Sequence, residues 1–315
     1  MRTVKAPEIN LNVFYDSLVK TIRENTIVPS CKDDNSRKIK AKSAFNDAKQ
    51  VLLKAEKLYL DKLKQGKVNE IPKGRYVKHN NTADDLINED YKWFYKKFRH
   101  SDTTSTIVDK LLNISSQKCI YCESRHGNDE LDHFLPESEY DYLTIVPANL
   151  LPSCSRCNKK KLAITGEIYH PYFSDFSAVN FISCEILIYS QTSSKHSVKL
   201  GNSNFHNVFR LKYKLVDESS VPDKTLYNQV RLVFEILDLS KRYSEMMTEI
   251  LDEDLYELQE MLKNTNLENF KGFLKIRIKG KSDSYSNNSC IIPFYLSLLN
   301  LLEKSSYFVE IFKSL

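Results

Sequence analysis

The sequence predicts an α+β fold in which helices dominate both ends of the chain and a small module with strands lies between them. Apolar residues recur every three or four positions over long stretches at both ends, as in helices that bury one face. In the middle, two Cys-x-x-Cys pairs stand about thirty residues apart, on either side of a short strand-like segment. The chain therefore divides into a helical region over 1–112, a central module over 113–175, and short strands followed by helices over 176–315.

In the N-terminal region, the apolar spacing predicts a long helix from Arg37 to about Gly66, with Ser36 as its N-cap. Shorter helices are expected over 88–99 and 106–112. The segment 88–99 is rich in aromatic residues, which more often pack in a core than stack on bases. We therefore expect these aromatic side chains in the core.

Basic residues outnumber acidic ones between Arg37 and Lys67. Such a stretch is either a solvated helix face or a surface that follows a phosphate backbone. Both interpretations stay open, and Lys54, Lys57 and Lys64 are the residues whose reversal separates them.

In the C-terminal region, alternating apolar and polar residues over 180–216 predict a few strands, and Val198 and Leu200 follow the same pattern. Residues 223–264 are expected as one long helical stretch, followed by helices over 267–279 and 291–312. The last of these carries an apolar stripe that either closes the protein's own core or contacts a partner, and it consists of Leu296, Leu299, Leu302 and Phe308.

The composition limits the class of protein. The 315 residues are 41% hydrophobic and carry a net charge of +5, which by itself does not indicate nucleic acid. No apolar run reaches the length of about 18 residues that a membrane span needs, and the N-terminus lacks the apolar stretch of a signal peptide. Glycine-rich nucleotide-binding motifs are absent from the sequence. We therefore expect a cytoplasmic protein without a membrane contact and without an ATPase of its own.

The seven cysteines are too few for a disulfide scaffold in a chain of this length. Cys31, Cys184 and Cys290 have no nearby partner in the sequence and are expected as buried free thiols. The two Cys-x-x-Cys pairs, by contrast, have the spacing of a structural zinc site with four thiolate ligands: Cys119, Cys122, Cys154 and Cys157.

Such a zinc site would bring two polar segments together. Asp132 and His133 lie between the cysteine pairs on a strand expected over 131–134, and Asn158 directly follows the last cysteine at the start of a helix. A loop is expected over 141–150 and contains Asn149. Strand, loop and helix in this order form a ββα-metal arrangement.

At this point the chain resembles the HNH endonucleases. The resemblance rests on the four cysteines together with Asp132, His133, Asn149 and Asn158, all in order. The motif segments look most like the Septu-type nuclease subunit of bacterial antiphage systems, which is also found beside some retrons. Asn158 stands where the family name has its final histidine, and asparagine is a common variant there. The resemblance implies a nuclease that works with an ATPase subunit of a Septu-like or retron-linked defence complex.

The chemistry follows from the residue types. Hydrolysis of a phosphodiester needs an attacking hydroxide and stabilisation of the charged transition state, for which a hard cation with oxygen ligands is suited. We expect Asp132 and Asn158 to hold a catalytic Mg²⁺ or Mn²⁺. His133 follows Asp132 on the strand, so its side chain points to the opposite face and is the candidate general base. Asn149 is expected either to orient this imidazole or to tie down the loop.

Basic residues around the second cysteine pair are the candidate nucleic-acid contacts, namely Arg156, Lys159, Lys160 and Lys161. Among the other histidines, we interpret His170 as a structural residue and His126 as an exposed residue without a role. DNA and RNA are not distinguished by these features. The competing interpretation of the whole chain is a catalytically inactive zinc-knuckle protein that binds nucleic acid or acts as a scaffold.

Overall fold

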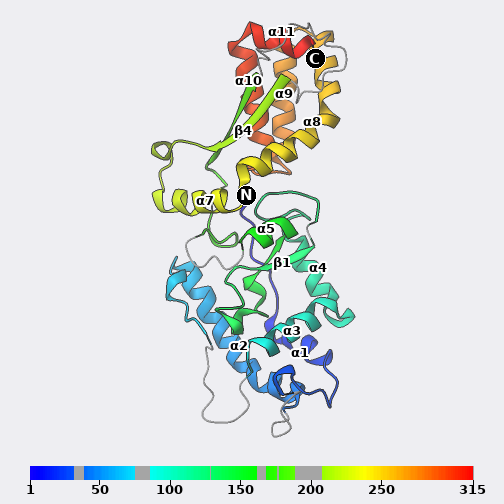
Figure 1. Ribbon diagram of the computed structural model, residues 1–315, viewed down its shortest axis with the longest axis vertical. Coiled ribbons are helices and arrows are strands. Elements are labelled where there is room, and N and C mark those ends of the chain that lie inside the picture. Colours follow the sequence, from blue (N-terminus) through cyan, green and yellow to red (C-terminus); the bar gives the residue numbers. More distant parts are fainter. Residues whose placement is uncertain are drawn as a thin grey trace, which may run out of the picture. The chain divides into compact units, whose positions relative to one another are not determined.

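The computed structural model describes residues 1–31, 39–74, 86–127, 129–161, 168–175, 177–188 and 208–314. The chain forms two compact units. The N-terminal unit consists of Thr3–Ile120 and Ser124–Ser174, and the C-terminal unit consists of Asp175–Leu315 together with Met1–Arg2 and Tyr121–Glu123. The described residues are mainly helical, with two antiparallel sheets of two strands each (Figure 1). The division into 1–112, 113–175 and 176–315 stays a prediction.

Four helices build most of the N-terminal unit: α1 (Leu11–Lys20), α2 (Ala41–Lys64), α3 (Asn88–His100) and α4 (Ser105–Asn113). The long helix α2 begins later than the sequence predicts. Lys40 is extended and forms a β-bridge with Ile27, so the helix does not run from Arg37. Ser36 and Arg37 themselves lie outside the described residues.

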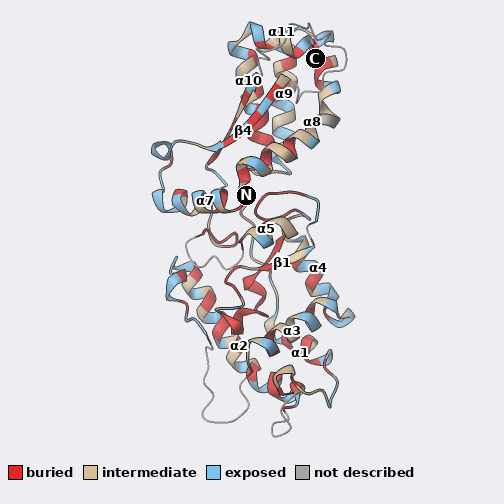
Figure 2. Cartoon of the chain, viewed as in Figure 1, coloured by how far each residue is buried: buried red, intermediate tan, exposed pale blue. Residues whose placement is uncertain are grey.

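Aromatic side chains fill the core between these helices, as the sequence predicts. The rings of Phe45 on α2 and Phe94 on α3 lie 4.8 Å apart, and those of Phe14 on α1 and Phe98 on α3 lie 5.2 Å apart. All four side chains are fully buried. Buried residues follow one side of α2, and its exposed side carries Lys54, Lys57 and Lys64 (Figure 2).

The central module starts with strand β1 (Glu130–His133) and continues through two 3-10 turns, η4 (Asp141–Leu143) and η5 (Pro147–Asn149). Strand β2 (Leu150–Ser153) pairs antiparallel with β1 and leads into helix α5 (Ser155–Lys161). The sequence interpretation placed a loop up to Leu150 and did not name β2. All four residues of β2 are buried, so the strand lacks the alternation by which a half-exposed strand is recognised.

The described residues of the C-terminal unit form a hairpin and five α-helices. Strand β3 (Ile182–Ile188) pairs with β4 (Phe209–Leu215) over their full lengths, while Val198 and Leu200 lie outside the described residues. The helices are α7 (Lys224–Ile236), α8 (Leu239–Asn264), α9 (Leu267–Ser282), α10 (Ile291–Lys304) and α11 (Ser306–Ser314).

Two helical stretches that the sequence analysis treated as continuous are broken. Asp238 adopts a left-handed conformation with φ of 51°, which ends the helical path after α7 and starts α8 in a new direction. Ser305 is extended with ψ of 104° and separates α10 from α11. Of the apolar stripe near the C-terminus, Leu302 and Phe308 are buried and Leu296 is 45% exposed, so part of the stripe closes the protein's own core.

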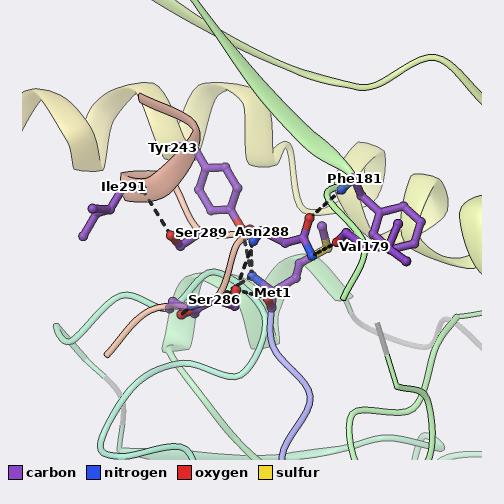
Figure 3. Close-up of polar contacts among 9 residues, drawn as sticks. Met1, Val179, Phe181, Tyr243, Ser286, Asn288, Ser289 and Ile291 are labelled. Carbon is purple, nitrogen blue, oxygen red and sulfur yellow. Dashed lines mark hydrogen bonds and ion pairs between the residues drawn. The ribbon is translucent and has the colours of Figure 1, made fainter. Parts of the chain in front are cut away.

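A polar cluster around Asn288 joins the start of the hairpin to the helices of the C-terminal unit (Figure 3). The side-chain oxygen of Asn288 accepts a hydrogen bond from the backbone N–H of Phe181 at 2.7 Å, and its amide nitrogen donates to the carbonyl oxygen of Val179 at 2.8 Å. The backbone oxygen of Asn288 accepts from the hydroxyl of Tyr243 at 2.9 Å and from the amino group of Met1 at 3.2 Å. One buried asparagine therefore fixes three distant segments of this unit.

Two further expectations concern cysteines and membranes. Cys31, Cys184 and Cys290 are buried thiols, as predicted. Within the described ranges, no helix has both the length and the apolar character that crossing a bilayer requires.

Candidate functional site

The hairpin of β1 and β2 separates the candidate site residues between its two faces. Successive side chains of a strand point to opposite faces, so Glu130 and Asp132 share one face of β1 and His133 lies on the other. Residues of β2 pair with them in register, with Leu151 opposite Asp132 and Leu150 opposite His133. Helix α5 packs against β1 on the face that carries the two carboxylates.

Each carboxylate of this face binds one side chain of α5. The amide nitrogen of Asn158 donates a hydrogen bond to Oε2 of Glu130 at 2.6 Å. The ammonium nitrogen of Lys161 lies 3.1 Å from Oδ2 and 3.3 Å from Oδ1 of Asp132, and also donates to the carbonyl oxygen of His133 at 2.7 Å. Positions 158 and 161 are three residues apart and therefore lie on one side of the helix. The two pairs hold α5 at a fixed register along β1.

The pairing of Asn158 has a chemical consequence for metal binding. A side-chain amide has a nitrogen end that only donates and an oxygen end that only accepts. Because Glu130 accepts from the nitrogen, the amide oxygen is the end of Asn158 that is left for a cation. Asp132 contributes two carboxylate oxygens, which the Lys161 ammonium contacts at 3.1 Å and 3.3 Å. The donor set of Asp132 and Asn158 therefore fits a hard divalent cation.

His133 is held in one tautomer. Its Nε2 atom lies 2.9 Å from the carbonyl oxygen of Thr144. A carbonyl oxygen can only accept, so Nε2 carries the proton and Nδ1 keeps a lone pair. The ring of Tyr95 packs against the imidazole with centroids 4.8 Å apart, and burial lowers the pKa of His133 below its usual value. Burial therefore favours the neutral imidazole, which is the form that accepts a proton.

Asn149 makes its hydrogen bonds to the loop and not to the imidazole. Its side chain is fully buried, and its oxygen accepts from the backbone N–H of Leu135 at 2.8 Å and from the hydroxyl of Tyr59 at 3.1 Å. Its nitrogen donates to the carbonyl oxygens of Leu135 at 3.0 Å and Leu143 at 3.2 Å. These contacts favour the second of the two expected roles, in which Asn149 ties down the loop between β1 and β2.

His170 belongs to the same buried network and is structural, as the sequence analysis interprets it. Its Nε2 atom lies 3.3 Å from the hydroxyl of Tyr59, and its Nδ1 atom accepts a hydrogen bond from the backbone N–H of Tyr172 at 3.2 Å. Burial lowers the pKa of His170 to about 3, so the ring stays neutral. His126 is exposed.

The four cysteines of the two pairs converge. Their sulfur atoms all lie within 4.8 Å of one another, and all four residues are buried. In a tetrahedral zinc site with bonds of about 2.3 Å, sulfur atoms are about 3.8 Å apart, so the cluster can hold a metal ion of this kind with small adjustments. The backbone N–H of Ile120 donates to the carbonyl oxygen of Pro152 at 3.0 Å, which ties the first cysteine pair to β2.

The expected nucleic-acid contacts need one correction. Lys159 is exposed, and Arg156 and Lys160 are half-buried. Lys161 is 2% exposed and is bound to Asp132, so it does not belong to a basic surface. Lys161 lies four residues after the buried Cys157, one helical turn further on the same side of α5, and for this reason it points inward.

Glu130 was missed by the sequence analysis. A signal was present, because a residue two positions before Asp132 on a strand shares its face. What the sequence does not give is the register of α5 against β1, which decides that Glu130 meets Asn158.

Comparisons with known proteins find one family model and two curated relatives that match parts of this chain. Residues 119–163 match the HNH endonuclease family model. The chain is also 38% identical over 93 residues to Septu protein PtuB of Bacillus thuringiensis, which is 27% of this chain and 36% of that protein. It is 36% identical over 73 residues to Protein ea31 of Escherichia phage lambda, covering 21% of this chain and 25% of that protein. No solved structure matches significantly.

The chain thus contains an HNH endonuclease domain, and its resemblance to the Septu protein PtuB, expected from the motif, is confirmed over part of its length. The alignments span about a third and a quarter of these two relatives.

Proposed function

We propose that this chain is a metal-dependent HNH endonuclease that hydrolyses phosphodiester bonds in nucleic acid. The observation that carries the proposal is the arrangement around β1 and α5. His133 has its Nε2 proton bound to the Thr144 carbonyl, which leaves Nδ1 as a base. On the opposite face of the strand, Asn158 has its amide nitrogen bound to Glu130, which leaves its oxygen as a ligand.

In this proposal Asp132 and Asn158 would hold a catalytic Mg²⁺ or Mn²⁺, which when bound would stabilise the charge on the phosphate and on the departing oxygen. The neutral His133 takes the proton of the attacking water at Nδ1. Lys161 keeps the Asp132 carboxylate in place from within the module, because it also binds the carbonyl oxygen of His133. The four cysteines hold a structural zinc ion that joins the segment before β1 to the start of α5.

We further propose that the protein is the nuclease of an antiphage defence complex and works with a separate ATPase subunit, in the cytoplasm. The support is the partial identity to Septu protein PtuB together with the lack of a nucleotide-binding motif in this sequence. The partner contact proposed from the sequence is the C-terminal helical segment that includes Leu296, whose side chain is 45% exposed.

The experiment combines purified full-length protein with labelled DNA and RNA in Mg²⁺ or Mn²⁺, with and without the ATPase encoded beside it. The proposal expects cleavage that EDTA abolishes. Binding of nucleic acid without cleavage, with both metals and with the partner present, would instead support the inactive zinc-knuckle alternative.

A pull-down with the ATPase tests the partner contact separately. We expect binding to be lost in a chain truncated before Ser282 and kept in the full chain. Undiminished binding by a folded truncated chain would refute the C-terminal assignment.

A further inference from the structure

An open cavity of about 970 Å³ lies within the C-terminal unit, between β4 and the first half of α8. It is lined by three basic side chains (Arg210, Lys212 and Lys241), by one carboxylate (Asp238), and by apolar residues that include Leu187 and Phe209. The residues that line it lie outside residues 119–163, which match the HNH endonuclease family model. The cavity combines a basic rim with an apolar lining.

The way in which α8 is attached to the sheet creates this cavity. The hydroxyl groups of Ser240 and Ser244 donate hydrogen bonds to the carbonyl oxygens of Tyr213 and Leu211, at 2.5 Å and 2.9 Å. These bonds occupy the outer edge of β4, so α8 runs along that edge. Lys241, which stands between the two serines on α8, lines the cavity as well.

Two of the three basic side chains, Arg210 and Lys212, come from the exposed face of the sheet. Buried and exposed residues alternate along β4, so that Phe209 and Leu211 point into the core while Arg210 and Lys212 point outward. Two residues of a strand span about 7 Å, which is comparable with the distance between adjacent phosphates in an extended single strand.

The cations of the cavity lack an ion pair within the described part of the chain, although Lys214 and, through its charge, Lys212 lower the pKa of Glu185. Glu185 is opposite Lys212 in the hairpin but forms its ion pair with Lys214, and the residue opposite Arg210 is Leu187. Among the residues that the structure describes, Arg210, Lys212 and Lys241 have no ion pair, whereas other lysines of this unit do, such as Lys224 with Glu218 and Lys263 with Glu260. Three cations therefore face one carboxylate in a shared cavity, an arrangement that attracts a polyanion.

We propose that this cavity binds a single-stranded segment of nucleic acid, with the basic side chains on its phosphates. Leu187 is 45% exposed and offers an apolar surface to an unstacked base or sugar, which a duplex does not present. The inference rests on the proposed nuclease function, because the substrate of a nuclease is a polyanionic nucleic acid. It adds a substrate-holding site in a unit outside the HNH domain.

The test uses the full chain with His133→Ala, so that the probe is not cut, and a short fluorescent DNA strand read by anisotropy. Replacing Arg210, Lys212 and Lys241 together by alanine should weaken binding by roughly tenfold or more at low salt and reduce the slope of log Kd against log salt by up to about 2. A control with the same change in charge replaces three ion-paired lysines of the same unit, Lys224, Lys263 and Lys271, and should keep both values.

Unchanged affinity and slope in the triple variant, with an unchanged circular dichroism spectrum, would overturn the proposal. The proposal would also be overturned if the triple variant lost as much affinity for a DNA duplex of the same length. It would equally be overturned if the variant lost affinity for polyglutamate but not for DNA. Cleavage in Mg²⁺ is measured separately, with the chain that keeps His133. If that cleavage fails while the three cations still govern DNA binding, the nuclease proposal fails and the binding site stands.

Discussion

Glu56→Gln should make the N-terminal unit more stable at alkaline pH. Glu56 lies on α2, is 3% exposed, and its Oε2 atom has no hydrogen-bond partner among the described residues. Burial raises the pKa of Glu56 from 4.5 to about 8. The folded protein therefore holds a proton on this carboxyl at neutral pH, and the unfolded chain releases it.

The size of the effect follows from the two pKa values. Below pH 4.5 both states are protonated, and above about 8 both are ionised, so the dependence on pH is confined to this window. Within this window, each rise of one pH unit lowers the free energy of unfolding by about 1.4 kcal/mol. The total loss across the window is up to about 5 kcal/mol. Glutamine does not titrate, so the variant should lack this slope.

The assay is urea unfolding at a series of pH values, followed by the fluorescence of Trp93. Trp93 is the single tryptophan of the chain and lies on α3 in the same unit as Glu56. Glu70→Gln is the control, since Glu70 is exposed and Lys62 lowers its pKa, so this control should keep the wild-type slope over the same window. Parallel curves for wild type and Glu56→Gln would show that Glu56 ionises freely in the folded protein and refute the argument.

Three further predictions concern the central module. The purified protein should contain about one zinc ion per chain by elemental analysis, and Cys157→Ser should be insoluble or unstable; folded protein without zinc would contradict the motif interpretation. Lys161→Met should lower the free energy of unfolding by about 3–5 kcal/mol, because it removes the cationic partner of the buried Asp132 carboxylate, while Lys159→Met at an exposed position should change it little. Glu130→Ala should weaken Mn²⁺ binding by about 10- to 100-fold in an electron paramagnetic resonance titration, and unchanged affinity would exclude its role in orienting Asn158.

The spacing of residues along the sequence was sufficient to predict two features of the structure. The convergence of the two cysteine pairs and the buried aromatic cluster both follow from patterns of a few residues. The left-handed Asp238 between α7 and α8 had no comparable signal, because the apolar periodicity continues through it. Strand β2 was hidden for a different reason, since its burial on both faces removes the alternation.

The contacts that give the site its chemistry depend on packing between elements. The partner of His133 is a backbone carbonyl eleven positions further along the chain, at Thr144, and no side-chain pattern marks it. Lys161 follows two other lysines and reads as part of a basic surface, yet the helical turn from Cys157 directs it inward. Sequence reasoning therefore named the residues of the HNH motif but not the register that relates them.

The most direct test of the central claim is a cleavage assay of His133→Ala with labelled DNA and RNA in Mg²⁺, with the zinc content measured on the same samples. The matched control is His126→Ala, which removes an exposed histidine near the first cysteine pair. The nuclease proposal predicts that wild type and His126→Ala cut and that His133→Ala does not, with equal zinc in all three. Cleavage by His133→Ala at the wild-type rate would contradict it.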